Sequence, residues 1–183
     1  MKILVSGFSP FAGFSENITQ KLVMGLPDLI NGNEIHKTIL DVTYQTAFEL
    51  LDKRIEELSP DIVIATGMAA SRKFISIEKI AVNINNSNTA DNAGIFKKDS
   101  IIIPGAEIAL TATLEYPKSV YLMDIVDTSY SAGTYICNDI FYRLLEKSTK
   151  RAYPFISFIH FPSATNISYE KQLSTFIDIL SCL

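Results

Sequence analysis

The chain has 183 residues and a formal net charge of −4. Hydrophobic residues make up 48% of it and charged residues 20%, a balance that predicts one globular domain over residues 1–183. The negative charge argues against nucleic-acid binding, and no apolar run is long enough to cross a membrane. With only two cysteines a disulfide framework is not expected, so we expect a reducing, cytoplasmic location without membrane association.

The apolar patterns along the chain alternate between strands and helices. The expected strands are Met1–Phe8, Ile35–Val42, Asp61–Gly67, Phe74–Asn85, Ser119–Ile125 and Phe155–His160; the expected helices run from Ile18 to Leu26, Tyr44 to Leu58, Gly133 to Glu146 and Tyr169 to Leu180. Such alternation predicts the α/β class: a mostly parallel, twisted sheet with helices on both faces, a three-layer α/β/α single domain.

Three residues follow or close the expected strands: Phe8, Met68 and His160. In open parallel sheets a ligand binds beyond the carboxyl ends of the strands. We therefore expect these three side chains to lie near one site.

The segment Ser131–Asn138 places Cys137 where small residues run into a helix. Unpaired N–H groups at a helix start carry partial positive charge and favour the reactive thiolate, which makes Cys137 a candidate nucleophile. A second interpretation stays open, because the helical spacing of Cys137 from Phe141 and Leu144 also suits a small core residue.

A cysteine nucleophile needs a base and a group that orients the base. His160 closes a core strand, whereas His36 lies on an expected strand surface, so His160 is the better candidate; it could equally cap the sheet edge. Glu78 is a lone carboxylate in an apolar run. If buried, it requires a partner such as Arg72, Lys79 or a histidine; alternatively it faces solvent.

The loop Gly7–Phe14 contains three phenylalanines directly after a strand. It lacks the glycine order of phosphate-binding loops, and Pro10 removes a backbone donor. The phenylalanines either fold back over the core or form a flat apolar slot for a small ring.

Six segments in order resemble the pyroglutamyl peptidase (pyrrolidone-carboxylate peptidase) family of cysteine peptidases. They are Gly7–Gly13, with Ala12 in place of a glycine, Asn17–Thr19, Glu78–Asn83, Asp91–Gly94, Ser131–Asn138 and Phe158–Pro162. The match spans nearly the whole chain, and the cysteine segment is its most specific part.

The resemblance implies removal of an N-terminal pyroglutamyl residue from small peptides, without a metal or other cofactor, by a protein that forms a dimer or tetramer of identical chains. It also implies three catalytic residues, namely Cys137 as nucleophile, His160 as base and acid and Glu78 as the orienting carboxylate, and a substrate site that includes Phe8, Phe11, Asn17 and Met68.

Two positions depart from the family pattern: Asn88 replaces an arginine and Met68 replaces a glutamine. They keep two alternatives open beside an active pyroglutamyl peptidase. One is a degenerate homologue that binds a pyroglutamyl-like ligand with little turnover. The other is a cysteine amidohydrolase that acts on another small cyclic amide.

Overall fold

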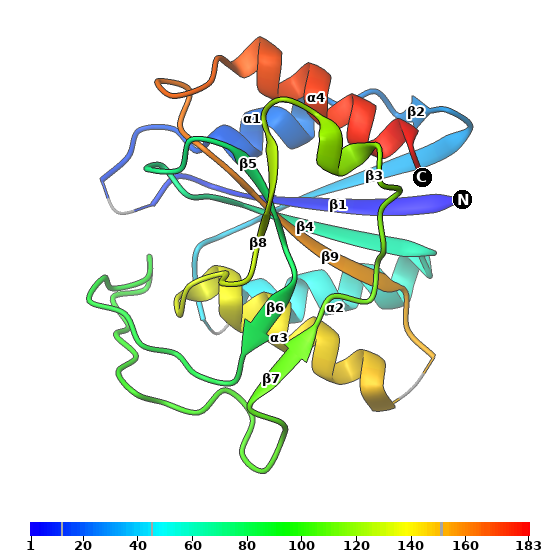
Figure 1. Cartoon of the computed structure of the whole chain (residues 1–183). Helices are drawn as coiled ribbons and strands as arrows, with labels where there is room; N and C mark the ends of the chain where they lie inside the picture. The colour runs from blue at the N-terminus through cyan, green and yellow to red at the C-terminus, as the bar shows by residue number, and fades with distance from the viewer. Residues whose placement is uncertain (12, 45, 151) are drawn as a thin grey trace.

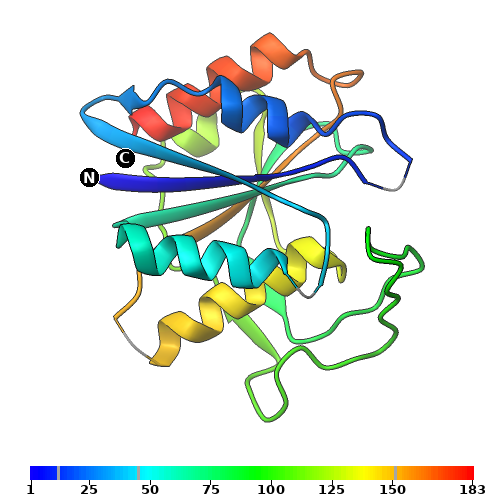
Figure 2. The same cartoon turned by 180° about the vertical axis from the view of Figure 1, so that it is seen from behind.

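The computed structural model describes residues 1–11, 13–44, 46–150 and 152–183. A seven-stranded sheet, in the order β2-β3-β1-β4-β9-β5-β8, lies between two pairs of helices (Figures 1 and 2). Helices α1 and α4 cover one face, and α2 and α3 cover the other. The predicted three-layer arrangement and mostly parallel sheet are confirmed.

The elements have the following bounds. The strands are β1 (Lys2–Phe8), β2 (Leu29–Ile30), β3 (Asn33–Leu40), β4 (Ile62–Met68), β5 (Ile75–Glu78), β6 (Ile80–Val82), β7 (Ala109–Thr111), β8 (Val126–Ser129) and β9 (Phe155–Phe161); the helices are α1 (Ile18–Gly25), α2 (Ala47–Leu58), α3 (Ile136–Lys150) and α4 (Tyr169–Ser181), with a short 3₁₀ helix η1 (Val120–Leu122).

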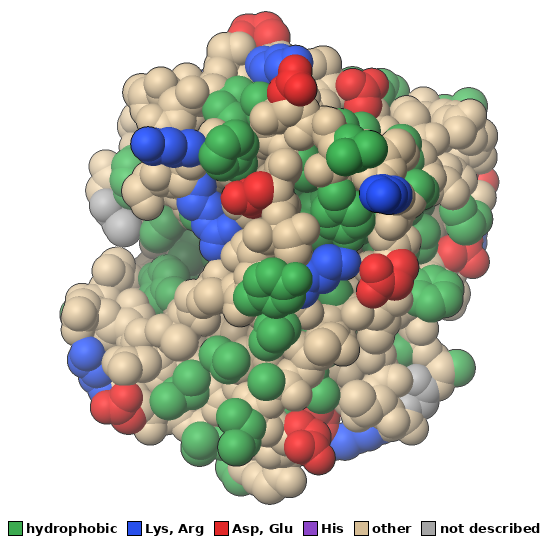
Figure 3. Space-filling model, viewed as in Figure 1, with side chains coloured by type: hydrophobic (Ala, Val, Ile, Leu, Met, Phe, Trp, Pro, Cys, Tyr) green, Lys and Arg blue, Asp and Glu red, His purple; other side chains and the backbone are tan. Residues whose placement is uncertain are grey.

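The central strands β3, β1, β4 and β9 run parallel, so their carboxyl ends meet at one edge of the sheet. Strands β1, β4 and β9 are buried over nearly their whole length, as continuous apolar strands covered on both faces are. Figure 3 shows the surface hollowed on the side where these strands end.

Two strand predictions were wrong in detail. The expected strand Phe74–Asn85 is divided at Lys79 into β5, in the large sheet, and β6, which pairs with β7 in a separate two-stranded sheet. The expected strand Ser119–Ile125 contains η1 instead, and the strand follows it as β8. Strand β5 also runs antiparallel to β9, which hydrophobic patterning could not reveal.

Two helices begin about three residues later than predicted, at Ala47 instead of Tyr44 and at Ile136 instead of Gly133. Helix α1 begins as expected, because the side chain of Asn17 accepts a hydrogen bond from the backbone N–H of Thr19.

Ala12 of the phenylalanine loop and Gln45 of the predicted Tyr44–Leu58 helix lie outside the described residues. Within the described ranges, no helix has the length and apolar character needed to span a membrane.

Candidate active site

A buried pair of ionisable side chains lies on neighbouring strands. His160 of β9 and Glu78 of β5 are joined by a 2.7 Å contact between Nδ1 and Oε1. Because Glu78 is paired with Phe158 across the antiparallel ladder, it is the diagonal neighbour of His160 on the same face. Glu78 is fully buried, so the solvent-facing alternative for this residue is wrong.

Arg72 compensates the buried carboxylate. Its Nη2 lies 2.7 Å from the same Oε1 of Glu78 and also donates a hydrogen bond of 2.9 Å to the backbone carbonyl of Ser131. A buried carboxylate is stable only when it is paired, as the sequence analysis required. Arg72 therefore links the carboxylate to the segment that precedes Cys137.

The thiol of Cys137 packs against Gly67 of β4. A Cβ atom at Gly67 would lie 2.6 Å from Sγ of Cys137 and 3.2 Å from Cδ2 of His160. The thiol and the imidazole are therefore neighbours above a position that only glycine can occupy without a clash. Cδ2 is bonded to Nε2, the ring nitrogen of His160 that Glu78 does not contact.

Burial is the largest influence on the ionisation of the Cys137 thiol and the His160 imidazole. Burial, and then the charge of Glu78, raise the pKa of the Cys137 thiol to about 12, with the charge of Arg72 acting in the opposite direction. Burial lowers the pKa of His160, although the hydrogen bond and charge of Glu78 oppose that shift. At neutral pH the thiol is protonated and the imidazole is neutral. The lowering effect expected from the backbone at the helix start is present, but burial outweighs it, and the net shift of the thiol pKa is upward.

A small cavity of about 140 Å³ opens beside the thiol. It is lined by Phe8, Phe11, Asn17, Val42, Met68, Tyr135, Ile136, Cys137 and His160. The rings of Phe11 and Tyr135 have centroids 6.3 Å apart, and Tyr135 packs edge-on against Tyr44. The cavity is thus a mostly apolar slot with aromatic walls, which suits a flat uncharged ring.

Asn17 supports the loop that carries two phenylalanines of this slot. Its Nδ2 donates to the carbonyl of Ser9, and its Oδ1 accepts hydrogen bonds from the backbone N–H and hydroxyl of Thr19. The hydroxyl oxygen of Thr19 accepts in turn from the backbone N–H of Phe8. Asn17 therefore fixes the slot as well as lining it.

The Asp91–Gly94 segment supports the same loop from the opposite side. Asp91 accepts hydrogen bonds from the backbone N–H groups of Ala93, Ile95 and Tyr44. The side-chain amide of Asn92 donates to the carbonyl of Pro10 and to Oδ1 of Asp41. Through these bonds the segment supports a site that it does not line.

The segment before Cys137 is held by its own polar groups. Gly133 has a φ of +79°, which favours glycine. The hydroxyl of Thr134 donates to the carbonyl of Asn86. The buried side chain of Asn138 accepts from the backbone N–H of Val82 and donates to its carbonyl. Together these contacts fix the start of α3, and with it the thiol.

The sequence-predicted site residues fall into three groups. Six of them, Phe8, Phe11, Asn17, Met68, Cys137 and His160, line the one cavity, and Glu78 lies directly behind His160. His36, on β3, and Asn88, an exposed residue, are not among the lining residues. Val42, Tyr135 and Ile136 also line the cavity and were not predicted from the sequence. Tyr135 could have been predicted, because it lies in the same segment as Cys137.

Comparison with known proteins identifies relatives of this chain in sequence and in fold. The family model described as pyroglutamyl peptidase matches residues 1–175. The pyrrolidone-carboxylate peptidase of Pyrococcus furiosus is 39% identical over 168 residues, covering 88% of this chain and 81% of that protein. That of Thermosipho melanesiensis is 37% identical, covering 94% and 88%. The crystal structure of the pyrrolidone carboxyl peptidase of Fervidobacterium islandicum AW-1 superimposes with a TM-score of 0.93 at 29% identity, covering 99% of this chain and 97% of that one.

Proposed function

The chain belongs to the pyroglutamyl peptidase family of hydrolases, and on that premise we propose that it cleaves the amide bond after an N-terminal pyroglutamyl residue through a thioester on Cys137. The observation that carries the proposal is the buried Glu78–His160 pair beside a thiol at the wall of a cavity of about 140 Å³. A cavity of this size takes one small ring and its carbonyl group.

In the first half of the reaction, neutral His160 takes the proton of the Cys137 thiol as Sγ attacks the scissile carbonyl carbon. The tetrahedral intermediate then collapses, the carbon–nitrogen bond breaks, and His160 gives its proton to the leaving amine. The product is a pyroglutamyl thioester. The raised thiol pKa and the lowered imidazole pKa suit a proton transfer that takes place only with substrate present.

In the second half, His160 removes a proton from water, which attacks the thioester carbon and releases pyroglutamate. The thiolate leaves and regains the proton from His160. Throughout, Glu78 accepts the Nδ1–H of His160, which keeps Nε2 directed toward the thiol and stabilises the imidazolium. Arg72 pairs with the same carboxylate oxygen of Glu78 and balances its charge.

The substrate ring is held by shape and by the absence of charge. Phe8, Phe11 and Tyr135 present aromatic surface to the two faces of a lactam, at little desolvation cost for an uncharged ring. Asn17 and the backbone around Met68 offer polar groups to the lactam N–H and carbonyl.

The test is the release of a fluorogenic amine from its pyroglutamyl amide. We expect turnover by the wild type and by Cys182→Ala, which removes the second free cysteine, and none by Cys137→Ala. Prolyl and glutaminyl amides of the same amine test for a different small amide substrate. Turnover by Cys137→Ala, or no turnover by a folded wild type, would overturn the proposal; the second result would favour a binding protein.

A further inference from the structure

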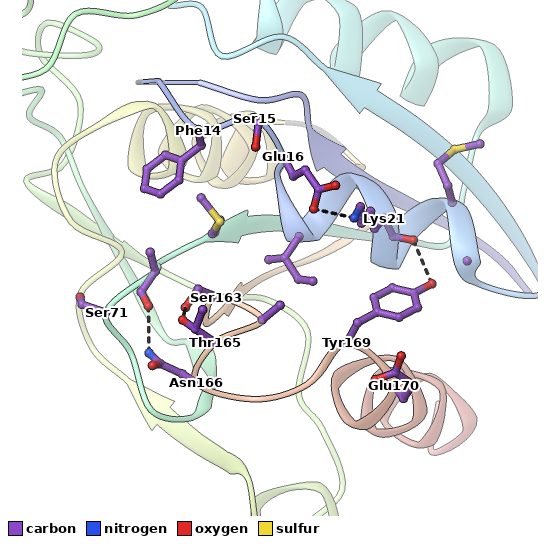
Figure 4. A pocket seen from close by; sticks show the side chains of 16 residues that line it. Phe14, Ser15, Glu16, Lys21, Ser71, Ser163, Thr165, Asn166, Tyr169 and Glu170 are labelled. Carbon is purple, nitrogen blue, oxygen red and sulfur yellow. Dashed lines mark hydrogen bonds and ion pairs between the residues drawn. The ribbon is translucent and has the colours of Figure 1, made fainter.

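A second cavity lies at the same edge of the sheet, on the side of α1 and α4. It is a groove of about 1290 Å³ between the β1–α1 loop and the β9–α4 loop (Figure 4). In Figure 4, Phe14 projects from one wall, and Ser163, Thr165 and Asn166 form the opposite wall. Its volume is far larger than the catalytic cavity, which has no room for the residues that follow the pyroglutamyl ring.

The groove adjoins the catalytic cavity at one shared residue. Met68, the last residue of β4, lines both. The preceding residue, Gly67, packs against the thiol of Cys137. Ser163, which lines the groove, comes three residues after His160. A peptide that leaves from His160 therefore has the groove within reach past Met68.

One wall of the groove is polar, and on the other wall apolar side chains stand beside an ion pair. Asn166 donates to the carbonyls of Ala70 and Arg72, which fastens the β9–α4 loop to the loop after β4. On the other side, Phe14 is 49% exposed and Met24 is 61% exposed. Large apolar side chains that face one groove while exposed to water are a common mark of a binding surface.

We propose that this groove, here named the leaving-peptide groove, binds the part of the substrate that follows the pyroglutamyl residue and prefers apolar residues there. The inference rests on the proposed function, since it needs a peptide to leave from His160. The groove binds an extended peptide of at least two residues, whose first nitrogen is joined to the scissile carbonyl.

The experiment compares two uncharged substrates, pyroglutamyl amide and pyroglutamyl-leucyl-leucine amide. In the wild type we expect a KM about tenfold lower for the longer one, because its leucines bury apolar surface. Met24→Lys and Ala164→Lys each place a cation in the groove and should raise that KM about fivefold, with no effect on pyroglutamyl amide. The matched control is Ile108→Lys, at a position 84% exposed and outside both cavities.

The outcomes separate the two proposals. Equal KM values for both substrates in the wild type, or an equal effect of Met24→Lys on both, would overturn the groove and leave the proposed function standing. A wild type that hydrolyses neither substrate would overturn the proposed function, and the groove with it. Binding of leucyl-leucine amide to Cys137→Ala, weakened by Met24→Lys but not by Ile108→Lys, would support the groove independently of turnover.

Discussion

The catalytic cavity and the leaving-peptide groove lie at one edge of the sheet and share Met68, yet they are built in different ways. The catalytic cavity is small, and His160 in its wall is buried and paired with the buried Glu78, which Arg72 also contacts. The groove is wide, and many of its lining side chains are exposed.

The difference shows where a protein needs a fixed geometry. Proton transfer and nucleophilic attack depend on small displacements. The imidazole and carboxylate are accordingly buried and hydrogen-bonded, and the thiol is packed against Gly67. Binding of a leaving peptide tolerates variation, because apolar contact is not directional. Changes that displace the thiol, imidazole or carboxylate should therefore slow the chemical step, whereas changes in the groove should alter only the preference among peptides.

The largest expected effect comes from adding one methyl group at Gly67. The new Cβ would lie 2.6 Å from Sγ of Cys137, so Gly67→Ala must displace the thiol. We expect kcat/KM for pyroglutamyl amide to fall by about 100-fold or more, since small misplacements have effects of that order. Steady-state kinetics, with thermal unfolding as a check of the fold, measures it.

A double variant identifies the cause. If the clash is with the sulfur, Gly67→Ala should lower the melting temperature less in a Cys137→Ala background than in the wild type. Full activity in Gly67→Ala would show that the reaction tolerates a displaced thiol. The catalytic cavity would then be no less tolerant of change than the groove.

The next effect concerns the pH dependence of the reaction. The base must be neutral, so the acid limb of kcat/KM follows the pKa of His160. The charge of Arg72 lowers that pKa and Glu78 raises it. Arg72→Gln should therefore move the limb to higher pH, and Glu78→Gln to lower pH, with a loss at neutral pH of about tenfold for Arg72→Gln.

Lys73→Gln is the matched control, because Lys73 is the exposed neighbour of Arg72. It should leave the pH profile unchanged. A shift in the same direction for Arg72→Gln and Glu78→Gln would contradict the assignment of His160 as the titrating base.

The residues of the site that lie at strand ends could be predicted from the pattern of apolar residues along the chain. Phe8, Met68 and His160 close strands that the apolar runs make visible, and parallel strands bring their ends together. The scarcity of histidine then narrowed the choice of base. For Glu78 the sequence required a partner if the carboxylate was buried, and left a solvent-facing position open.

What the sequence could not predict depends on contacts between distant segments. The antiparallel pairing of β5 with β9 places Glu78 beside His160, and no local pattern encodes it. Arg72 was only one of three possible partners for Glu78 until the loop after β4 was placed. The thiol pKa was predicted in the wrong direction, because a helix start is visible in a sequence and burial is not.

A smaller effect is expected at the aromatic wall of the catalytic cavity. Phe8 is only 3% exposed and belongs to the core, so Phe8→Leu is preferable to Phe8→Ala, which would also destabilise the fold. We expect Phe8→Leu to raise KM about fivefold for both substrates with little change in kcat, because ring contact binds ground state and transition state alike. Phe96→Leu, at an exposed phenylalanine outside both cavities, is the control.

A variant of the groove, in contrast, should raise KM for the longer substrate alone. An unchanged KM in Phe8→Leu would remove Phe8 from the ring-binding slot. A rise confined to the longer substrate would assign Phe8 to the groove instead.

The smallest effect is expected at Asn92, which supports the slot without lining it. Asn92→Ala removes the bonds to Pro10 and Asp41 that hold the phenylalanine loop from outside. Because both bonds are solvent-exposed, their loss should raise KM only about threefold for both substrates, equivalent to less than about 1 kcal/mol. Asn86→Ala, at another exposed asparagine, should change neither KM. If Asn92→Ala changed KM for the longer substrate alone, the loop would position the groove and not the slot, and the two cavities would share their support as well as Met68.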